Sequence, residues 1–173
     1  MTIYFGDGSD QPVSGKIIQV VQHAKRDTFS GQANTSEISV TGLAATITPK
    51  FNDSKIMVCV NINFSCTSTT YAMYVKRGST LFGRGTASGS RQQAIIGLGH
   101  GHDDNQQESA SMNYIDSPAT TSAITYQVFL NNDNARDIHI NRSVNDGDNV
   151  IAKRLTSTVT LFELERCTTS ETT

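Results

Sequence analysis

Two histidines on either side of a glycine are the first residues in this sequence that could do chemistry. His100 and His102 are followed directly by Asp103 and Asp104. On a β-strand the two histidines would share a face, and a carboxylate could complete a metal site. A polar loop tip with two solvated histidines explains the same pattern, and we prefer that interpretation. His100 and His102 are therefore kept only as metal candidates, strengthened if a threefold axis brings several copies together, and no cofactor is expected.

An acidic run at 145–149 offers oxygen ligands of the kind that calcium takes. It lacks the downstream glutamate of an EF-hand loop, so we predict a tight turn. The chain contains no Gly-x-Ser-x-Gly nucleophile motif, and no pair of carboxylates stands out for glycoside hydrolysis. These patterns predict a protein that is not an enzyme.

Charge and hydropathy exclude further classes of function. The formal net charge is −2, which gives no general attraction to nucleic acid or to an anionic membrane. No apolar run approaches the ~20 residues of a membrane-spanning helix. Cys59, Cys66 and Cys167 fit no zinc pattern, and we predict free thiols. Because no leader peptide is visible, we expect synthesis in a cytoplasm.

The element that organises the rest is a run of alternating residues at 55–65. One set of side chains is apolar throughout and consists of Ile56, Val58, Val60, Ile62 and Phe64. The opposite set begins with Met57 and Cys59 and becomes polar. Successive side chains on a strand point to opposite faces, so this run predicts the central strand of an antiparallel sheet with one face on a core.

Similar two-residue periodicity recurs along the chain and predicts nine or ten strands. The run at 15–24 has apolar residues on both faces, which is typical of a strand between two surfaces. We expect a polar connection at 25–35, a break at Gly42 and a hairpin turn at 77–80. Short strands at regular spacing indicate an all-β fold, namely an antiparallel β-sandwich or jelly roll.

The two ends of the chain differ from this pattern. Residues 1–14 contain the apolar triplet Ile3, Tyr4 and Phe5 and then glycines and aspartates. We interpret this segment as a short extended N-terminal arm whose triplet binds a neighbouring subunit, since fifteen extended residues reach roughly 50 Å. A short edge strand or a frayed terminus is the alternative. The predicted organisation is therefore an arm at 1–14, a β-sandwich at 15–166 and a polar tail at 167–173.

Several runs resemble a module found in virion proteins of bacteriophages, especially cyanophages and other marine phages. The matching runs are residues 15–22, 41–49, 54–58, 75–80 and 158–164, together with the most distinctive one, Asn113-Tyr114-Ile115-Asp116-Ser117-Pro118-Ala119-Thr120-Thr121. The resemblance implies a trimeric β-sandwich of the kind found in fibres and head decorations. It brings no catalytic residue with it.

The resemblance implies a virion structural protein made in the host cytoplasm. A module with a short arm suits a capsid decoration or cement protein, or a small head fibre, that forms a homotrimer and binds other virion proteins such as the major capsid protein. The alternative is a tail-fibre tip or receptor-binding protein whose loops contact host surface glycans. Neither nucleic acid nor membrane is an expected partner.

Overall fold

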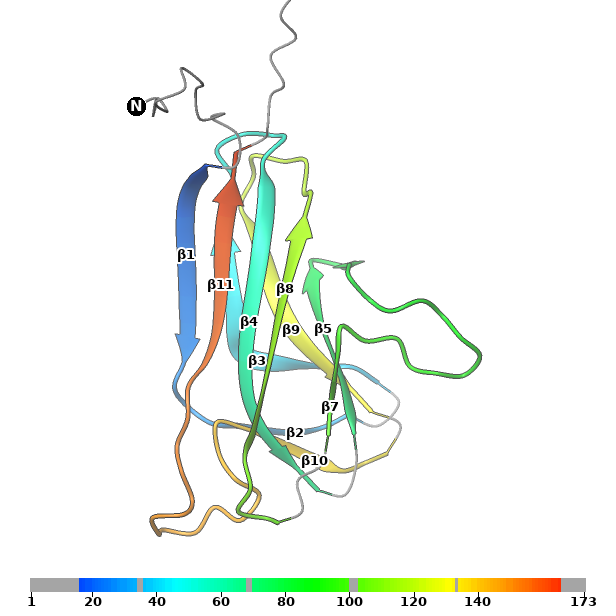
Figure 1. Cartoon of the computed structure of the whole chain (residues 1–173), viewed down its shortest axis with the longest axis vertical. Helices are drawn as coiled ribbons and strands as arrows, with labels where there is room; N and C mark the ends of the chain where they lie inside the picture. Colours follow the sequence, from blue (N-terminus) through cyan, green and yellow to red (C-terminus); the bar gives the residue numbers. More distant parts are fainter. Residues whose placement is uncertain (1–15, 34–35, 68–69, 100–102, 133, 166–173) are drawn as a thin grey trace, which may run out of the picture.

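The computed structural model describes residues 16–33, 36–67, 70–99, 103–132 and 134–165. Within these ranges the protein is all-β, and two antiparallel sheets pack face to face (Figure 1), which confirms the predicted class. The strands are β1 (Ile17–Lys25), β2 (Phe29–Gln32), β3 (Ile38–Ile47), β4 (Lys55–Cys66), β5 (Tyr71–Arg77), β6 (Thr80–Leu81), β7 (Ile96–Leu98), β8 (Glu108–Asp116), β9 (Ile124–Asn131), β10 (Asp137–Ile140) and β11 (Ser157–Leu164). No helix able to cross a bilayer occurs in these ranges.

The connectivity is that of a jelly roll. In the first sheet β4 lies between β8 on one side and β11, then β1, on the other, with β10 and β2 continuing the sheet at its far end. The second sheet has the order β3-β9-β5, and β6 and β7 both pair with β5. The chain therefore passes from sheet to sheet as it proceeds, which is the double Greek key of this fold.

The core lies between the sheets and follows the alternation that the sequence shows. The inward side chains of β4 are all buried, as predicted: Ile56, Val58, Val60, Ile62 and Phe64. They meet buried residues of the second sheet, among them Tyr126, Val128 and Met73. Each such side chain contributes roughly 1.5–3 kcal/mol by leaving water, so this interface between sheets holds the fold together.

One strand was missed by the sequence analysis. Residues 25–35 were expected to form a polar connection, but β2 lies within them and pairs with β10, where Ser30 faces His139. Gly31 lies against side chains in this strand, since a Cβ there would lie 2.9 Å from Ile38 Cδ1 and 3.0 Å from the Phe29 ring. A run of four residues with one apolar side chain carries little local signal, and backbone bonding to a distant strand decides its structure.

The two ends of the described chain meet at one end of the first sheet. The Glu165 backbone amide donates to the Lys16 carbonyl at 2.8 Å. The predicted arm with Ile3, Tyr4 and Phe5 and the predicted tail at 167–173 lie outside the described residues. Whatever precedes Lys16 is therefore joined to the sandwich next to β11.

Candidate functional site

The histidine metal candidates cannot be placed, because His100 and His102 lie outside the described residues. Asp103, which follows them, accepts hydrogen bonds from the Asn105 backbone amide at 2.7 Å and from Asn105 Nδ2 at 3.0 Å. Its carboxylate therefore closes a local turn. Among the residues that the structure describes, no group of three or more His, Cys, Asp or Glu side chains could hold a metal ion.

The acidic loop at 145–149 is held by contacts to residues on either side of it. Arg142 donates to Asp146 at 2.9 Å, and Arg154 forms a second ion pair with the same carboxylate. The hydrogen bond from Arg154 and the charges of both arginines lower the pKa of Asp146 below its ordinary value. Both oxygens of the Asp146 carboxylate therefore already face guanidinium groups.

The buried polar groups serve the fold. Asp116 accepts a hydrogen bond from Arg77 Nε at 2.7 Å and another from the Tyr126 hydroxyl at 2.8 Å. Burial, followed by the neighbouring Asp116, raises the pKa of Tyr126. These side chains bond to one another, with Asp116 and Tyr126 buried and Arg77 partly exposed.

Cys59 carries a free thiol, as predicted for it, and the two described cysteines differ in environment. Cys66 is buried, and its Sγ lies 3.2 Å from the Gly99 carbonyl oxygen. Burial, with a smaller contribution from Glu108, raises the pKa of its thiol to about 11. Cys59 lies half-buried on the outer side of β4, and burial also raises its pKa. Neither thiol has the low pKa of a catalytic nucleophile.

The surface that stands out is apolar. Val20 of β1 lies opposite Phe162 of β11, Phe162 opposite Met57 of β4, and Met57 opposite Ile115 of β8. We call these four residues the outer band, because they form one continuous row across four strands on the solvent side of the first sheet. Val20 and Ile115 are 53% and 54% exposed, and the other two are half-buried. A whole row of the sheet is therefore apolar where water would normally favour polar side chains.

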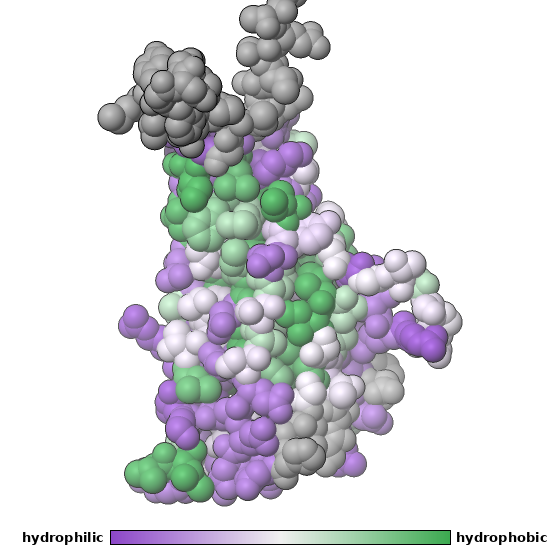
Figure 2. Space-filling model, viewed as in Figure 1, coloured by the Kyte–Doolittle hydropathy of each residue, from purple (hydrophilic) through white to green (hydrophobic). Residues whose placement is uncertain are grey.

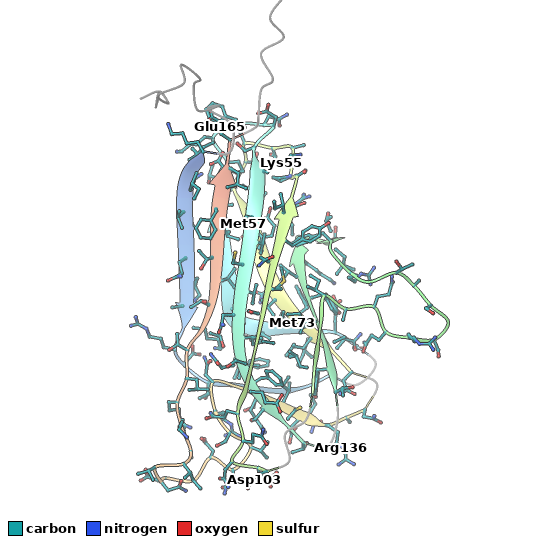
Figure 3. All side chains as sticks on the ribbon, viewed as in Figure 1. Lys55, Met57, Met73, Asp103, Arg136 and Glu165 are labelled. Atoms are coloured by element: carbon teal, nitrogen blue, oxygen red, sulfur yellow. The ribbon has the colours of Figure 1, made fainter. Side chains whose placement is uncertain are left out.

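The outer band lies near the end of the sheet where the chain enters and leaves. Figure 3 places Met57 in that half of β4, with Lys55 and Glu165 beyond it and Asp103 and Arg136 toward the other end. Hydrophobic surface gathers over the same part of the sheet in Figure 2, whereas the opposite end is mostly hydrophilic. The pair Ile17 and Leu164 continues the apolar surface toward the end of the sheet.

Uncharged residues, most of them with hydroxyl or amide side chains, occupy the next two rows of the same face. These rows are Gln22, Thr160, Cys59 and Asn113, and then Ala24, Thr158, Asn61 and Ser111. Together with the outer band they make three rows of four residues, and none of these side chains carries a charge. Depletion of charge in the centre of a patch is a feature of protein–protein interfaces.

The sequence analysis identified apolar residues on individual strands but did not predict that they form one surface. The apolar residues on both faces of 15–24 predicted a surface on each side of that strand, and Met57 began the second face of the central strand. Within the described residues, one face of β1 packs on the second sheet, and the other face, which carries Val20, is exposed to solvent. That the four apolar residues form one row depends on strand register, which no single strand reveals.

Comparisons with known proteins identify no family. No family model and no curated protein matches the chain. Among solved structures, a mutant VP2 protein of infectious bursal disease virus in T=1 particles matches with 12% identity over 84% of this chain, and a structure of the Gt strain of that virus matches with 13% identity over 92%. Both have a TM-score of 0.39.

These viral structures are much longer than the chain described here. The chain spans 36% of the first and 40% of the second, about two fifths of their length. At these TM-scores the likeness carries no argument about function. The resemblance to phage virion modules stays an inference from the sequence.

Proposed function

We propose that this chain is a non-enzymatic virion structural protein that assembles with copies of itself through the outer face of its first sheet. The observation that carries the proposal is the outer band, an exposed apolar row across four strands. In water such a row costs free energy, at about 25 cal/mol per Å² of apolar surface left exposed, and a partner removes that cost.

The surroundings of the outer band favour a second copy as the partner. A face whose three rows carry no charge can pack against another copy of the chain without leaving an unpaired ion. Homo-oligomers with closed symmetry are the commonest assemblies of soluble chains. A homotrimer is the form that the sequence resemblance implies.

On the virion, the trimer would be a capsid decoration or cement protein or a small head fibre. Its further partners would be other virion proteins such as the major capsid protein, and its place would be the particle surface after synthesis in the host cytoplasm. A jelly-roll sandwich fits this role, because it presents broad sheet faces and loops on a rigid frame.

The test is the mass of the full chain in native buffer, by light scattering or native mass spectrometry. We expect a trimer for the unmodified chain and a monomer for Ile115→Asp and, independently, for Val20→Asp, because a carboxylate in the outer band would be buried without a partner. Thr86→Asp, on an exposed loop far from the outer band, is the matched control and should stay trimeric. A monomeric unmodified chain would rule the proposal out.

A specific observation favours the alternative, a tail-fibre tip or receptor-binding protein. The loop at 83–92 is exposed along its whole length and projects from the body of the molecule in Figure 1. Its base is held by hydrogen bonds from the Gly85 amide to the Ala94 carbonyl at 3.1 Å and from Gln93 Nε2 to the Gly85 carbonyl at 2.6 Å. Labelling of host cells by purified protein, lost when this loop is shortened, would favour the alternative.

A further inference from the structure

The outer band lies beside the point where residues 1–15 join the sandwich. The described chain begins at Lys16, and Ile17 pairs with Leu164 at the end of the sheet. Val20 and Phe162, two members of the outer band, are the outward-facing pair that follows on the same two strands. The segment ahead of Lys16 is therefore attached within a few residues of the apolar row.

That segment has the composition and the length to reach such a row. Ile3, Tyr4 and Phe5 are its apolar cluster, and residues 6–15 separate this cluster from Lys16. Extended, the connection spans roughly 35–40 Å. Four neighbouring strands are only ~14 Å wide between the outer two, so the cluster could cover the outer band of its own copy or of an adjacent copy.

The size of the outer band indicates that more than four side chains make the contact. A stable interface between proteins takes roughly 20–30 residues a side. A segment of fifteen residues laid along the apolar row brings additional area on both partners. An exchange of such segments also leaves no outer band uncovered, because each copy gives one segment and receives one in a closed ring.

We propose that residues Ile3–Phe5 of one copy lie on the outer band of a second copy. This inference depends on the proposed self-assembly and names the part of the partner that covers the row. The second copy is favoured over the same copy because β1 runs from Lys16 into the sheet and away from the segment. Coverage of its own band would require the chain to reverse between Phe5 and Lys16, whereas a neighbour can be reached along an extended path.

A crosslinking experiment on the full chain tests the contact. Cys59 and Cys167 are first changed to serine, since Cys59 lies on the same face as the outer band and Cys66 is buried. One preparation then carries Tyr4→Cys, and a second preparation, lengthened by a tag, carries Ile115→Cys. The two are mixed, oxidised and separated on a non-reducing denaturing gel. The matched control replaces Ile115→Cys by Ser111→Cys, four residues away on the same face of β8.

We expect a covalent species that contains one copy of each length, formed at least about tenfold faster with Ile115→Cys than with Ser111→Cys, because docking raises the local concentration of the thiol. We also expect Phe5→Asp to lower the mass of the assembly to that of a monomer. Equal rates for the two positions would overturn the inference. So would self-closure of a chain that carries both Tyr4→Cys and Ile115→Cys, seen as a crosslinked monomer.

The outcomes separate this inference from the proposed function. If the unmodified chain is a trimer, but Phe5→Asp stays trimeric and no Tyr4–Ile115 link forms, only the exchange of segments fails. If the unmodified chain is a monomer, the proposed self-assembly itself fails and the exchange of segments fails with it.

Discussion

Glu163 of β11 is a charged residue at a core-facing position. It is fully buried between the sheets and accepts hydrogen bonds from the Ser54 hydroxyl at 2.7 Å, the Lys50 backbone amide at 2.6 Å and Gln19 Nε2 at 2.5 Å. Burial alone would raise the pKa of this carboxyl, but the hydrogen bonds from Ser54, Gln19 and Lys50 outweigh it and hold the pKa below its ordinary value. The carboxylate thus fixes the turn before β4 to the ends of β1 and β11.

We predict that Glu163→Gln lowers the free energy of unfolding by about 2 kcal/mol at neutral pH, because an amide nitrogen would face donors that now bond to a carboxylate. The lowered pKa means that the unfolded chain binds the proton more readily. The stabilisation is therefore complete above the unfolded-state pKa of about 4.3 and is lost as the pH falls through the folded-state value. Urea unfolding at pH 7 and pH 3 measures the change. Glu165→Gln, two residues further on, should have little effect, and an equal loss at both pH values would contradict this account.

At the level of single residues, the sequence indicates which side chains point inward. It does not show how a charged side chain such as Glu163 is accommodated at an inward position. Val159, Leu161 and Glu163 share one face of the last strand by simple alternation. Glutamate is seldom buried without partners, so its position in the alternation did not by itself predict that Glu163 is buried. Its three donors come from parts of the chain more than a hundred residues away, and only the fold brings them together.

Among the elements, β3 contains a glycine whose position the sequence analysis identified as irregular but whose structural role it misinterpreted. The sequence analysis expected a break between strands at Gly42. The structure has one strand, Ile38–Ile47, in which the pairing with β9 shifts register between Ser39 and Ala44 and Gly42 has a φ of +76°. A glycine in the left-handed region is typical of a β-bulge, which bends the strand and continues the ladder.

We predict that Gly42→Ala destabilises the protein by about 1–2 kcal/mol, because any other residue is strained at this positive φ. An added Cβ would also lie 3.4 Å from Lys25 Nζ, an ammonium group that is almost fully buried. Gly97→Ala in β7 is the control, since a Cβ there meets nothing within 4 Å. The shift in the denaturant midpoint reports the difference, and equal midpoints for the two variants would contradict the bulge as the cause.

Local periodicity predicts whole elements well where the strand is long. The run predicted at 55–65 became β4, Lys55–Cys66, and was found to within one residue, because half of its side chains enter the core. Short elements such as β2 depend on pairing with distant partners and leave no such signal. The outer band, like β2, depends on pairing between distant strands, since it forms only when four strands align their outward-facing residues in register.

On the scale of the whole molecule, the two ends of the sandwich differ in character. The outer band and the entry of the chain lie at one end. At the other, the loop after β10 presents Val150, 94% exposed, and Ile151, whose backbone amide is held by Asn149 Oδ1 at 3.0 Å. An assembly through the outer band would leave this second end free for other contacts on the particle.

The proposed assembly makes the stability of the chain depend on its concentration. If the outer band is buried only in the oligomer, mass action stabilises the folded state as the concentration rises. A tenfold increase corresponds to about 1 kcal/mol per subunit in a trimer. We therefore predict that the melting temperature of the unmodified chain rises by roughly 2–4 °C for each tenfold increase in concentration.

Ile115→Asp should abolish this dependence while leaving the melting temperature of the dilute protein almost unchanged, because Ile115 is exposed in the isolated subunit. Thr86→Asp should retain it. Differential scanning fluorimetry over three decades of concentration measures both. If Ile115→Asp instead lowered the melting temperature equally at every concentration, the residue would stabilise the single chain, and the outer band would be part of the fold with no role in assembly. If Ile115→Asp removes the dependence of the melting temperature on concentration without lowering the melting temperature of the dilute protein, only burial of Ile115 between subunits explains the result.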